Sequence, residues 1–322
     1  MFIKRYVVFI SSVLFCITAL SAQPRSYQDV PFWQDYSVKY ALTAENNALR
    51  LNQVRSDRNG VIYVLSSNGL LQPAQGQLVT GGLYRPFEDM NFSGMDIYKG
   101  HFVYLNSSSV FSNGWAGKNL IQHNRELANH FAVGNNFSVL LSDGAELLFY
   151  RQGEQIFSHD LESGSVLDIE YSPDTQMFYL ITNSALYLFD PEQLEISRKF
   201  SAENITALAI SDDRSLLILG TTNGLISLDP RTFAKKGDIH REIPWTEINC
   251  VEIIGDKVWA GTPRGAFSLD RDGSINYYAS KRWLVDDHVL DIAKGPEKSI
   301  LVLSKTGLSR IQFKQMTLAD KA

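Results

Sequence analysis

Residues 289–311 read VLDIAKGPEKSILVLSKTGLSRI, and this stretch decides the expected fold. It holds three short apolar runs, Val289–Ile292, Ile300–Leu303 and Leu308–Ile311, which are separated by turns that contain glycine. Runs of this length between turn residues predict β-strands, because a helix needs a longer stretch with a period of 3.6 residues. One small sheet of such strands cannot bury both of its faces, so we expect similar sheets to pack against it.

A unit of this kind recurs along the chain. Its second strand is the most apolar part, and the central residues of these strands lie 36 to 43 residues apart. These residues are Tyr63, Tyr104, Leu140, Tyr179, Ile218, Trp259 and Val302. Three or four short strands in every 40 residues or so, with hardly any helical pattern between them, are typical of propeller blades. The sequence therefore predicts an all-β fold, a seven-bladed β-propeller over residues 37–313.

The last unit lacks an outer strand of its own. Ser37–Leu42, ahead of the first unit, has strand character. We expect this N-terminal strand to pair beside Leu308–Phe313 in the last blade and so to close the ring. Residues 23–36 would then be an N-terminal arm and residues 314–322 a C-terminal tail. The alternative is a three-stranded last blade, with residues 23–45 as a loose arm.

The first residues have the pattern of a secretory signal. Two basic residues precede the apolar run Tyr6–Leu20, and Ser21-Ala22 offers small residues for cleavage. We expect residues 1–22 to be removed as a signal peptide, which leaves a secreted or periplasmic protein without a membrane segment. An uncleaved membrane anchor is the alternative, although the run is short for a bilayer span.

Composition narrows the classes of function. The chain has 322 residues, of which 44% are hydrophobic, and this is too much apolar content for a disordered chain. A formal net charge of −5 provides no electrostatic footprint for nucleic acid. Of the two cysteines, Cys16 lies in the signal, so Cys250 cannot form an internal disulfide. The expected partner is a glycan or another protein.

Several motifs resemble a known family of repeats. Val289–Ala293, Gly295–Lys298 and Ile300–Ile311 together resemble the two-component regulator propeller repeat, and Ile248–Leu269 is similar to another copy. The match is weak from about residue 90 to 150. The resemblance implies a seven-bladed extracytoplasmic ring that senses a carbohydrate or another ligand, usually ahead of a further domain and a kinase. The chain contains no kinase sequence, so the resemblance implies no kinase activity here.

Common catalytic motifs are absent from the sequence. It contains no phosphate-binding loop, no His-Glu-x-x-His, no Gly-x-Ser-x-Gly and no Cys-x-x-Cys. The six histidines are scattered without the spacing of metal ligands. Asp270–Gly273 has a trace of a calcium loop, but a hairpin turn explains it better because the downstream ligands are missing. We therefore expect neither a metal nor a cofactor.

Binding sites on propellers are built from loops that surround the central channel on one face. These loops are the entries to the first strands and the turns between second and third strands. The ligand-binding candidates in them are His130, Asp143, Trp245, Arg264, Trp283, His288 and Lys305. The tryptophans could stack on a sugar ring, and Arg264 and Lys305 could hold a carboxylate or sulfate. For each residue taken singly, a solvated loop side chain is the alternative.

Two classes of function follow from these candidates. The first is a non-enzymatic binding module that recognises a carbohydrate or a protein partner on the loop-rich face. The second is a carbohydrate-active lyase or hydrolase, or the N-terminal part of a larger carbohydrate-active protein. Its catalytic residues would be His288 as base, Asp287 and Arg264, because a carboxylate can orient an imidazole and raise its basicity. The lack of a catalytic motif favours the binding module.

Two aspartates recur at the third place of a first strand. Asp168 and Asp291 occupy this place in two units, and Cys250 occupies it in a third. Recurrence at a repeat position predicts a structural role, such as a hydrogen bond to the backbone of a neighbouring blade. On the same argument, we expect Cys250 to be an inert buried thiol.

Overall fold

The computed structural model describes residues 29–80, 90–112, 119–211, 215–239 and 243–321. It divides into two compact units, and each is described by itself. The larger unit is Gln34–Lys314; the smaller combines the residues up to Trp33 with Gln315–Ala322. The predicted signal peptide, residues 1–22, lies outside the described part of the chain.

Five sheets of the larger unit have four strands each, in sequence order. The first consists of β6 (Gly94–Tyr98), β7 (His101–Leu105), β8 (Ser109–Ser112) and β9 (Asn119–Gln122). The next two consist of β10 (Ala128–Val133), β11 (Val139–Asp143), β12 (Glu146–Arg151) and β13 (Glu154–Asp160), then β14 (Asp168–Ser172), β15 (Met177–Ile181), β16 (Ala185–Asp190) and β17 (Glu195–Ser201). The last two consist of β18 (Ile205–Ile210), β19 (Leu217–Thr221), β20 (Gly224–Leu228) and β21 (Lys235–Ile239), then β22 (Cys250–Ile254), β23 (Lys257–Thr262), β24 (Gly265–Leu269) and β25 (Ile275–Tyr278).

A sixth sheet has eight strands in the order β2-β3-β4-β5-β1-β28-β27-β26. Its strands are β1 (Phe32–Leu42), β2 (Leu51–Ser56), β3 (Ile62–Ser66), β4 (Gly69–Ala74), β5 (Gln77–Val79), β26 (Val289–Lys294), β27 (Ile300–Ser304) and β28 (Gly307–Met316). The described helices are single 3-10 turns, η2 (Asn135–Phe137), η3 (Pro296–Lys298) and η4 (Ala319–Lys321). The chain is therefore all-β, as predicted.

The burial of each strand follows from its place in its sheet. Second strands such as β3, β15 and β27 are almost wholly buried, because neighbouring sheets cover both of their faces. The fourth strand β13 is exposed along nearly its whole length, and its sequence is correspondingly polar. Aromatic rings fill the space between sheets: Phe149 of β12 lies 5.9 Å from Phe178 of β15 and 5.1 Å from Phe189 of β16.

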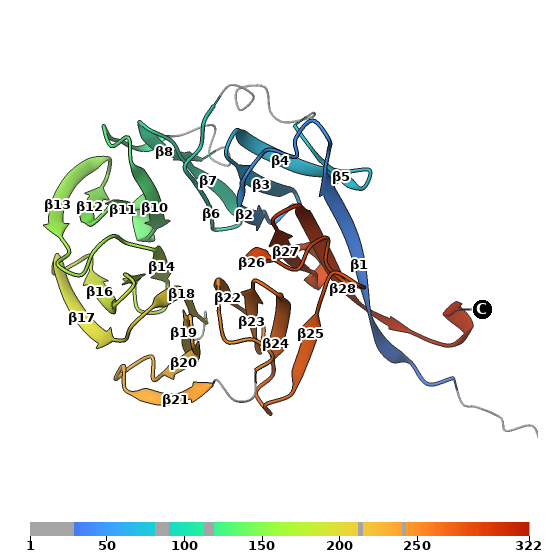
Figure 1. Cartoon of the computed structure of the whole chain (residues 1–322). Helices are drawn as coiled ribbons and strands as arrows, with labels where there is room; N and C mark the ends of the chain where they lie inside the picture. The colour runs from blue at the N-terminus through green and yellow to red at the C-terminus, as the bar shows by residue number, and fades with distance from the viewer. Residues whose placement is uncertain (1–28, 81–89, 113–118, 212–214, 240–242, 322) are drawn as a thin grey trace, which may run out of the picture. The chain divides into compact units, whose positions relative to one another are not determined.

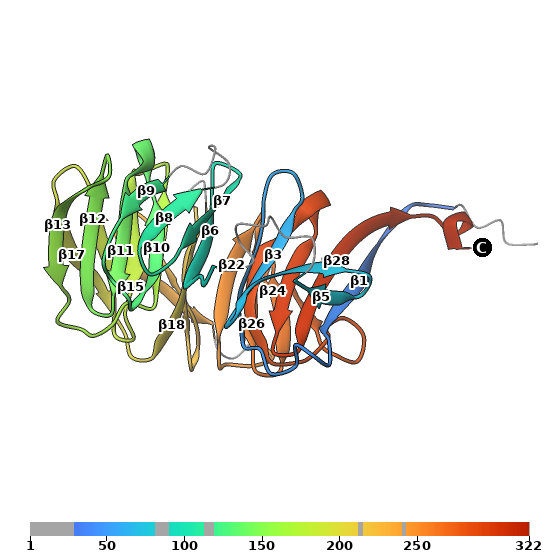
Figure 2. The same cartoon turned by 90° about the horizontal axis from the view of Figure 1, so that it is seen from above.

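The sheets stand like blades around a common centre. Figure 1 shows the first strands β10, β14, β18 and β22 inside and the fourth strands β13, β17, β21 and β25 outside. Figure 2, turned by 90°, shows the strands of these sheets running upright beside one another. Each first strand contacts the first strand of the next sheet, from β2 through β6, β10, β14, β18 and β22 to β26, and β26 contacts β2. The first strands thus follow one another in cyclic order.

Strand β1 lies between β5 and β28 and so joins the earliest strands of the larger unit to its last ones. It begins at Phe32, ahead of the predicted start at Ser37. The amide of Leu42 donates to the carbonyl of Thr306 at 2.9 Å, and Ala41 pairs in parallel with Gln77 of β5. A Cβ atom on Gly307 would lie 2.3 Å from the carbonyl oxygen of Tyr40, so only glycine admits this close approach.

The smaller unit contains the described chain ends. Here the Asp29 carboxylate accepts hydrogen bonds from the amides of Leu318, at 2.6 Å, and Ala319, at 3.1 Å. The side chain of Asp320 accepts bonds from the amide and hydroxyl of Thr317. These contacts fix η4, a single turn within residues 314–322, the predicted C-terminal tail.

Candidate functional site

A cavity of about 790 Å³ lies at the centre of the larger unit. Its wall is formed by residues of the first strands β2, β6, β10, β14, β18, β22 and β26, together with the ends of their loops. We call it the central cavity. First strands alternate: one set of side chains packs between the sheets and the other set is directed toward the cavity. In β14, for example, Ile169 is buried, whereas its neighbours Asp168 and Glu170 are half-buried at the wall.

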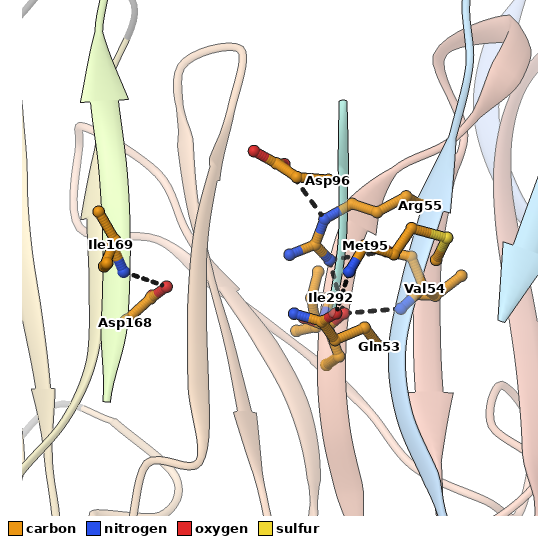
Figure 3. Close-up of polar contacts among 9 residues, drawn as sticks. Gln53, Val54, Arg55, Met95, Asp96, Asp168, Ile169 and Ile292 are labelled. Atoms are coloured by element: carbon orange, nitrogen blue, oxygen red, sulfur yellow. Dashed lines mark hydrogen bonds and ion pairs between the residues drawn. The ribbon is translucent and has the colours of Figure 1, made fainter. Parts of the chain in front are cut away.

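Five carboxylates and one guanidinium dominate this wall. They come from five different first strands, at the third or fifth place of each unit. They are Arg55 of β2, Asp96 of β6, Asp168 and Glu170 of β14, Glu252 of β22 and Asp291 of β26. Figure 3 shows Arg55 reaching toward Asp96, with Asp168 on the opposite side. Asp57, Arg58 and Lys294 also line the cavity, so acidic side chains outnumber basic ones there by six to three.

Arg55 of β2 links its strand to two other first strands, β26 and β6. Its guanidinium lies 2.7 Å from a carboxylate oxygen of Asp291 and 3.8 Å from one of Asp96. Burial disfavours the charged guanidinium, but these carboxylates raise the pKa of Arg55 above its ordinary value. The side chains of Arg55, Asp291 and Asp96 remain 24%, 15% and 38% exposed, because they face the cavity rather than dry protein.

Several wall side chains also bond the backbone of the adjacent first strand. A carboxylate oxygen of Asp291 accepts from the amide of Val54 in β2 at 2.8 Å. Glu170 of β14 accepts in the same way from Ile210 of β18 at 3.1 Å. The structural role predicted for Asp291 is thus confirmed. Asp168, in contrast, accepts from its own strand neighbour, Ile169, at 2.9 Å.

Burial moves the titration of the acidic wall toward neutral pH. Desolvation raises the pKa of Glu252 to about 8, although Arg55 lowers it. The pKa values of Asp96, Asp168 and Glu170 are raised for the same first reason. At neutral pH the carboxyl group of Glu252 therefore stays mostly protonated. Cys250 is half-buried and lines the central cavity, so the predicted full burial is wrong. Desolvation nevertheless raises the pKa of its thiol well above the ordinary value, which makes it a weak nucleophile.

The structure separates the predicted ligand-binding residues. Of these candidates only His130, in β10, lines the central cavity, and burial lowers the pKa of its imidazole to about 4. Asp143 lies at the end of β11, 3.8 Å from the guanidinium of Arg125. The other five lie in entry loops and second turns of the sheets that contain β22 and β26.

In these loops, two arginine side chains each lie over a tryptophan ring. The guanidinium carbon of Arg264 lies 4.6 Å from the ring centre of Trp245, and that of Arg282 lies 4.2 Å from the ring centre of Trp283. We call these contacts the two arginine–tryptophan stacks. The indole N–H of Trp245 is buried and lacks a hydrogen-bond partner in the described structure. One face of each predicted sugar-stacking ring is therefore already covered by a cation.

The turn that carries Arg264 is held rigidly. The hydroxyl of Thr262 accepts a hydrogen bond from the amide of Arg264 at 3.0 Å and donates to the carbonyl of Gly265 at 2.8 Å. Gly265 has φ +128°, a backbone conformation that side-chain-bearing residues rarely adopt. The hydroxyl of Tyr277 donates to the carbonyl of Arg264. In the equivalent turn between β19 and β20, the backbone amide of Asn223 donates to the hydroxyl of Thr221.

The predicted catalytic Asp287 and its neighbour Asp286 make other contacts. A carboxylate oxygen of Asp286 accepts from the backbone amide of His288 at 2.7 Å. Asp287 accepts from the amide and the hydroxyl of Ser280, at 2.6 and 2.9 Å. The backbone of His288 in turn accepts from the amide of Lys305 at 3.1 Å. These carboxylates thus shape the loop, and within the described residues neither is hydrogen-bonded to the His288 imidazole.

Comparisons with known proteins find relatives in fold alone. No family model and no curated protein matches the chain. A streptogramin B lyase structure superposes with a TM-score of 0.67 at 11% identity, covering 87% of this chain and 98% of that one. The extracellular domain of a putative hybrid two-component system from B. thetaiotaomicron gives a TM-score of 0.67 at 16% identity. This superposition covers 86% of this chain and 39% of that one. The Neurospora crassa Pan2 WD40 domain gives a TM-score of 0.62 at 10% identity, covering 88% of this chain and 96% of that one.

The chain folds as a β-propeller. At these identities the likeness establishes the scaffold and leaves the ligand open. On this propeller, the described residues contain no group of three or more His, Cys, Asp or Glu side chains placed to hold a metal ion. Asp270–Gly273 forms the turn between β24 and β25, where Asp272 accepts from the amide of Ser274 at 2.9 Å. None of the described helices has the length and apolar character of a membrane span.

The acidic wall is the feature that the sequence analysis missed. Asp168 and Asp291 were recognised at the third place of their strands, but the fifth place was not compared. It carries Arg55, Asp96, Glu170 and Glu252 in four of the units. Two polar or charged residues with one buried apolar residue between them follow the two-residue period of a strand that has one face toward water. This alternation was the available signal.

Proposed function

We propose that the chain is a non-enzymatic, ligand-binding β-propeller that recognises a carbohydrate or a protein partner on its loop-rich face. In this proposal the eight-stranded sheet is two blades joined by β1, so that seven blades form the ring and the N-terminal strand closes it. The cyclic contacts of the seven first strands support this count. The protein acts outside the cytoplasm once its signal peptide is removed, a location that the extracellular domain among its structural neighbours also favours.

The contacts of Asp286 and Asp287 are the observation that carries this proposal. Both carboxylates are engaged by loop hydrogen bonds at 2.6–2.9 Å, so they hold the loop in place rather than orient an imidazole for catalysis. A loop fixed in this way is suited to recognition, because little conformational entropy is lost when a ligand binds. The described propeller thereby offers a preformed surface around Arg264, Trp283 and Lys305.

One observation favours the second candidate, a carbohydrate-active lyase or hydrolase. The pKa of Glu252, raised to about 8, keeps its carboxyl group protonated at neutral pH inside the central cavity. A protonated carboxyl beside ionised ones is the arrangement that general acid–base catalysis uses. In this candidate the reacting groups are Glu252 and its neighbours rather than His288, Asp287 and Arg264.

A glycan array followed by a turnover assay tests the proposal. We expect the purified mature chain to retain selected glycans, and the solution above them to contain no cleavage products. Retention should fall in the Arg264→Ala variant and persist in Glu252→Gln. Product formation that Glu252→Gln abolishes would establish the enzyme instead. An array without any bound glycan would remove carbohydrate as the ligand and leave a protein partner.

A further inference from the structure

The loop-rich face gathers exposed cations on a chain that is acidic overall. Four basic side chains on two neighbouring sheets are exposed, and none forms an ion pair with another described residue. They are Arg264, Lys281, Arg282 and Lys305. Basic residues elsewhere pair readily, as Lys257 does with Asp270 at 2.9 Å and Arg310 with Glu297 at 2.9 Å. Unpaired cations at this place leave room for an external anion.

Two of these cations are held in a defined orientation. Each guanidinium of the two arginine–tryptophan stacks lies over an indole ring, a contact that fixes its plane and leaves its edge available. The flat edge of a guanidinium matches a carboxylate or a sulfate with two parallel hydrogen bonds. A stacked arginine is therefore prepared to bind an anionic group with little loss of side-chain freedom.

The two stacks are connected through neighbouring residues. The hydroxyl of Tyr277 donates to the carbonyl of Arg264, and the ring of Tyr278 lies 5.8 Å from that of Trp283. Because consecutive side chains of a strand leave opposite faces, Tyr277 and Tyr278 reach the two stacks from opposite sides of the end of β25. Tyr277 keeps 41% of its surface exposed, so an aromatic ring next to Arg264 is open to a ligand.

The loop between the stacks is anchored in the protein. Leu284 is completely buried, the amide of Val285 donates to the hydroxyl of Ser309 at 2.9 Å, and Lys39 of β1 donates to the carbonyl of Ser280 at 3.1 Å. The half-buried carboxylate of Asp287 accepts from Ser280 in the same loop, and that of Asp286 accepts from the amide of His288 and from the hydroxyl of Thr306 in the β27–β28 turn. The exposed carboxylate nearest to a stack in sequence is that of Glu247, two residues beyond Trp245.

We propose that the two arginine–tryptophan stacks form a binding site for an anionic glycan, one that carries uronate carboxylates or sulfates. This inference rests on the proposed function and narrows its ligand class. Arg264 and Arg282 each take one anionic group, and the exposed ring of Tyr277 packs against the apolar face of a sugar next to Arg264. The exposed aromatic ring favours a glycan over an acidic peptide, and the covered indole faces disfavour a neutral sugar that must stack on them.

Calorimetric titration with a defined oligogalacturonate tests the proposal, with a neutral galacto-oligosaccharide of equal length and polyglutamate as the comparison probes. At low salt, we expect the oligogalacturonate to bind and the other two to bind at least tenfold more weakly. Arg264→Gln combined with Arg282→Gln should weaken oligogalacturonate binding at least tenfold. Glu247→Gln should strengthen it about twofold, and added salt should weaken it, since charges are being screened.

The matched control is Arg198→Gln. Arg198 lies over the ring of Tyr187 at 5.6 Å in the sheet of β16 and β17, away from the loop-rich face, so its loss should leave binding unchanged. Unfolding temperatures of all variants confirm that they fold. Equal binding of polyglutamate, or an unaffected double variant, would overturn the anionic-glycan site. Binding of the neutral sugar alone, or of neither sugar, would refute this inference, whereas the proposed function is tested separately by the glycan array.

Discussion

Replacement of Arg55 by methionine probes the electrostatics of the central cavity directly. The guanidinium contacts Asp291 at 2.7 Å and lowers the pKa of Asp96, Asp168 and Glu252, which burial raises. Methionine keeps most of the side-chain volume but removes the charge, so Asp291, Asp96, Asp168 and Glu252 lose the cation that lies among them. We expect the folded protein to lose stability at neutral and alkaline pH.

The magnitude follows from the geometry of the pair. Removing one partner of a fully buried ion pair costs about 3–5 kcal/mol. Here the loss should be smaller, about 2 kcal/mol, because Arg55 is 24% exposed and Asp291 still accepts a hydrogen bond from Val54 at 2.8 Å. For a chain of this size we expect a fall in unfolding temperature of about 4–6 °C.

The loss of stability in the variant should depend on pH. When the cation is gone, the folded-state pKa values of Asp96, Asp168 and Glu252 rise further above those of the unfolded chain. Raised carboxyl pKa values lower stability above the unfolded pKa and have no effect below it, where both states are protonated. The variant should therefore lose most stability at pH 8 and little at pH 4.

Thermal unfolding by circular dichroism at pH 4, 6 and 8 provides the assay. The control is Arg271→Met, which removes an exposed ion pair with Asp256 at 3.0 Å and should change the unfolding free energy by less than about 0.5 kcal/mol at every pH. An Arg55→Met protein that unfolds like the wild type at pH 8, or that is equally destabilised at pH 4 and pH 8, would refute the reasoning.

Two further predictions concern single residues of the propeller. In urea titrations, Glu252→Gln should raise the unfolding free energy more at pH 9 than at pH 5. The pKa of Glu252 is about 8 in the folded protein and near 4.5 in the unfolded chain, so the wild type loses stability between these values and the variant does not. Parallel pH profiles of the two proteins would contradict this. Gly307→Ala should destabilise the protein by about 1–3 kcal/mol, since the added Cβ would lie 2.3 Å from the carbonyl oxygen of Tyr40; an unchanged urea midpoint would show that β1 is not packed on β28.

The repeat could be predicted from local patterns because each blade is encoded by neighbouring residues. Short apolar runs between glycine turns specify a strand wherever they occur, and the stretch 289–311 contains the two turns and three strands that the structure shows there. The start of β1 at Phe32 was harder to predict. Its residues are only half-buried, and its pairing partners β5 and β28 lie far away in the sequence.

The site was predictable only in part, for a different physical reason. Sequence position assigned Trp245 and Arg264 to loops at one face, but whether a cation covers an indole depends on contacts between separate turns. The cavity wall depends in the same way on residues that the ring brings together from β2, β6 and β26. Neighbours in sequence were misleading at His288, where Asp286 bonds the backbone amide.

Hydrogen–deuterium exchange of the amides in β1 tests the central claim, that the N-terminal strand completes the last blade and seals the ring on which the loop-rich face depends. We predict that the amides of Ser37–Leu42 exchange as slowly as those of Leu308–Ile311 and become exposed together with them in rising urea. Rapid exchange of Ser37–Leu42 in a protein whose β27 and β28 remain protected would contradict it.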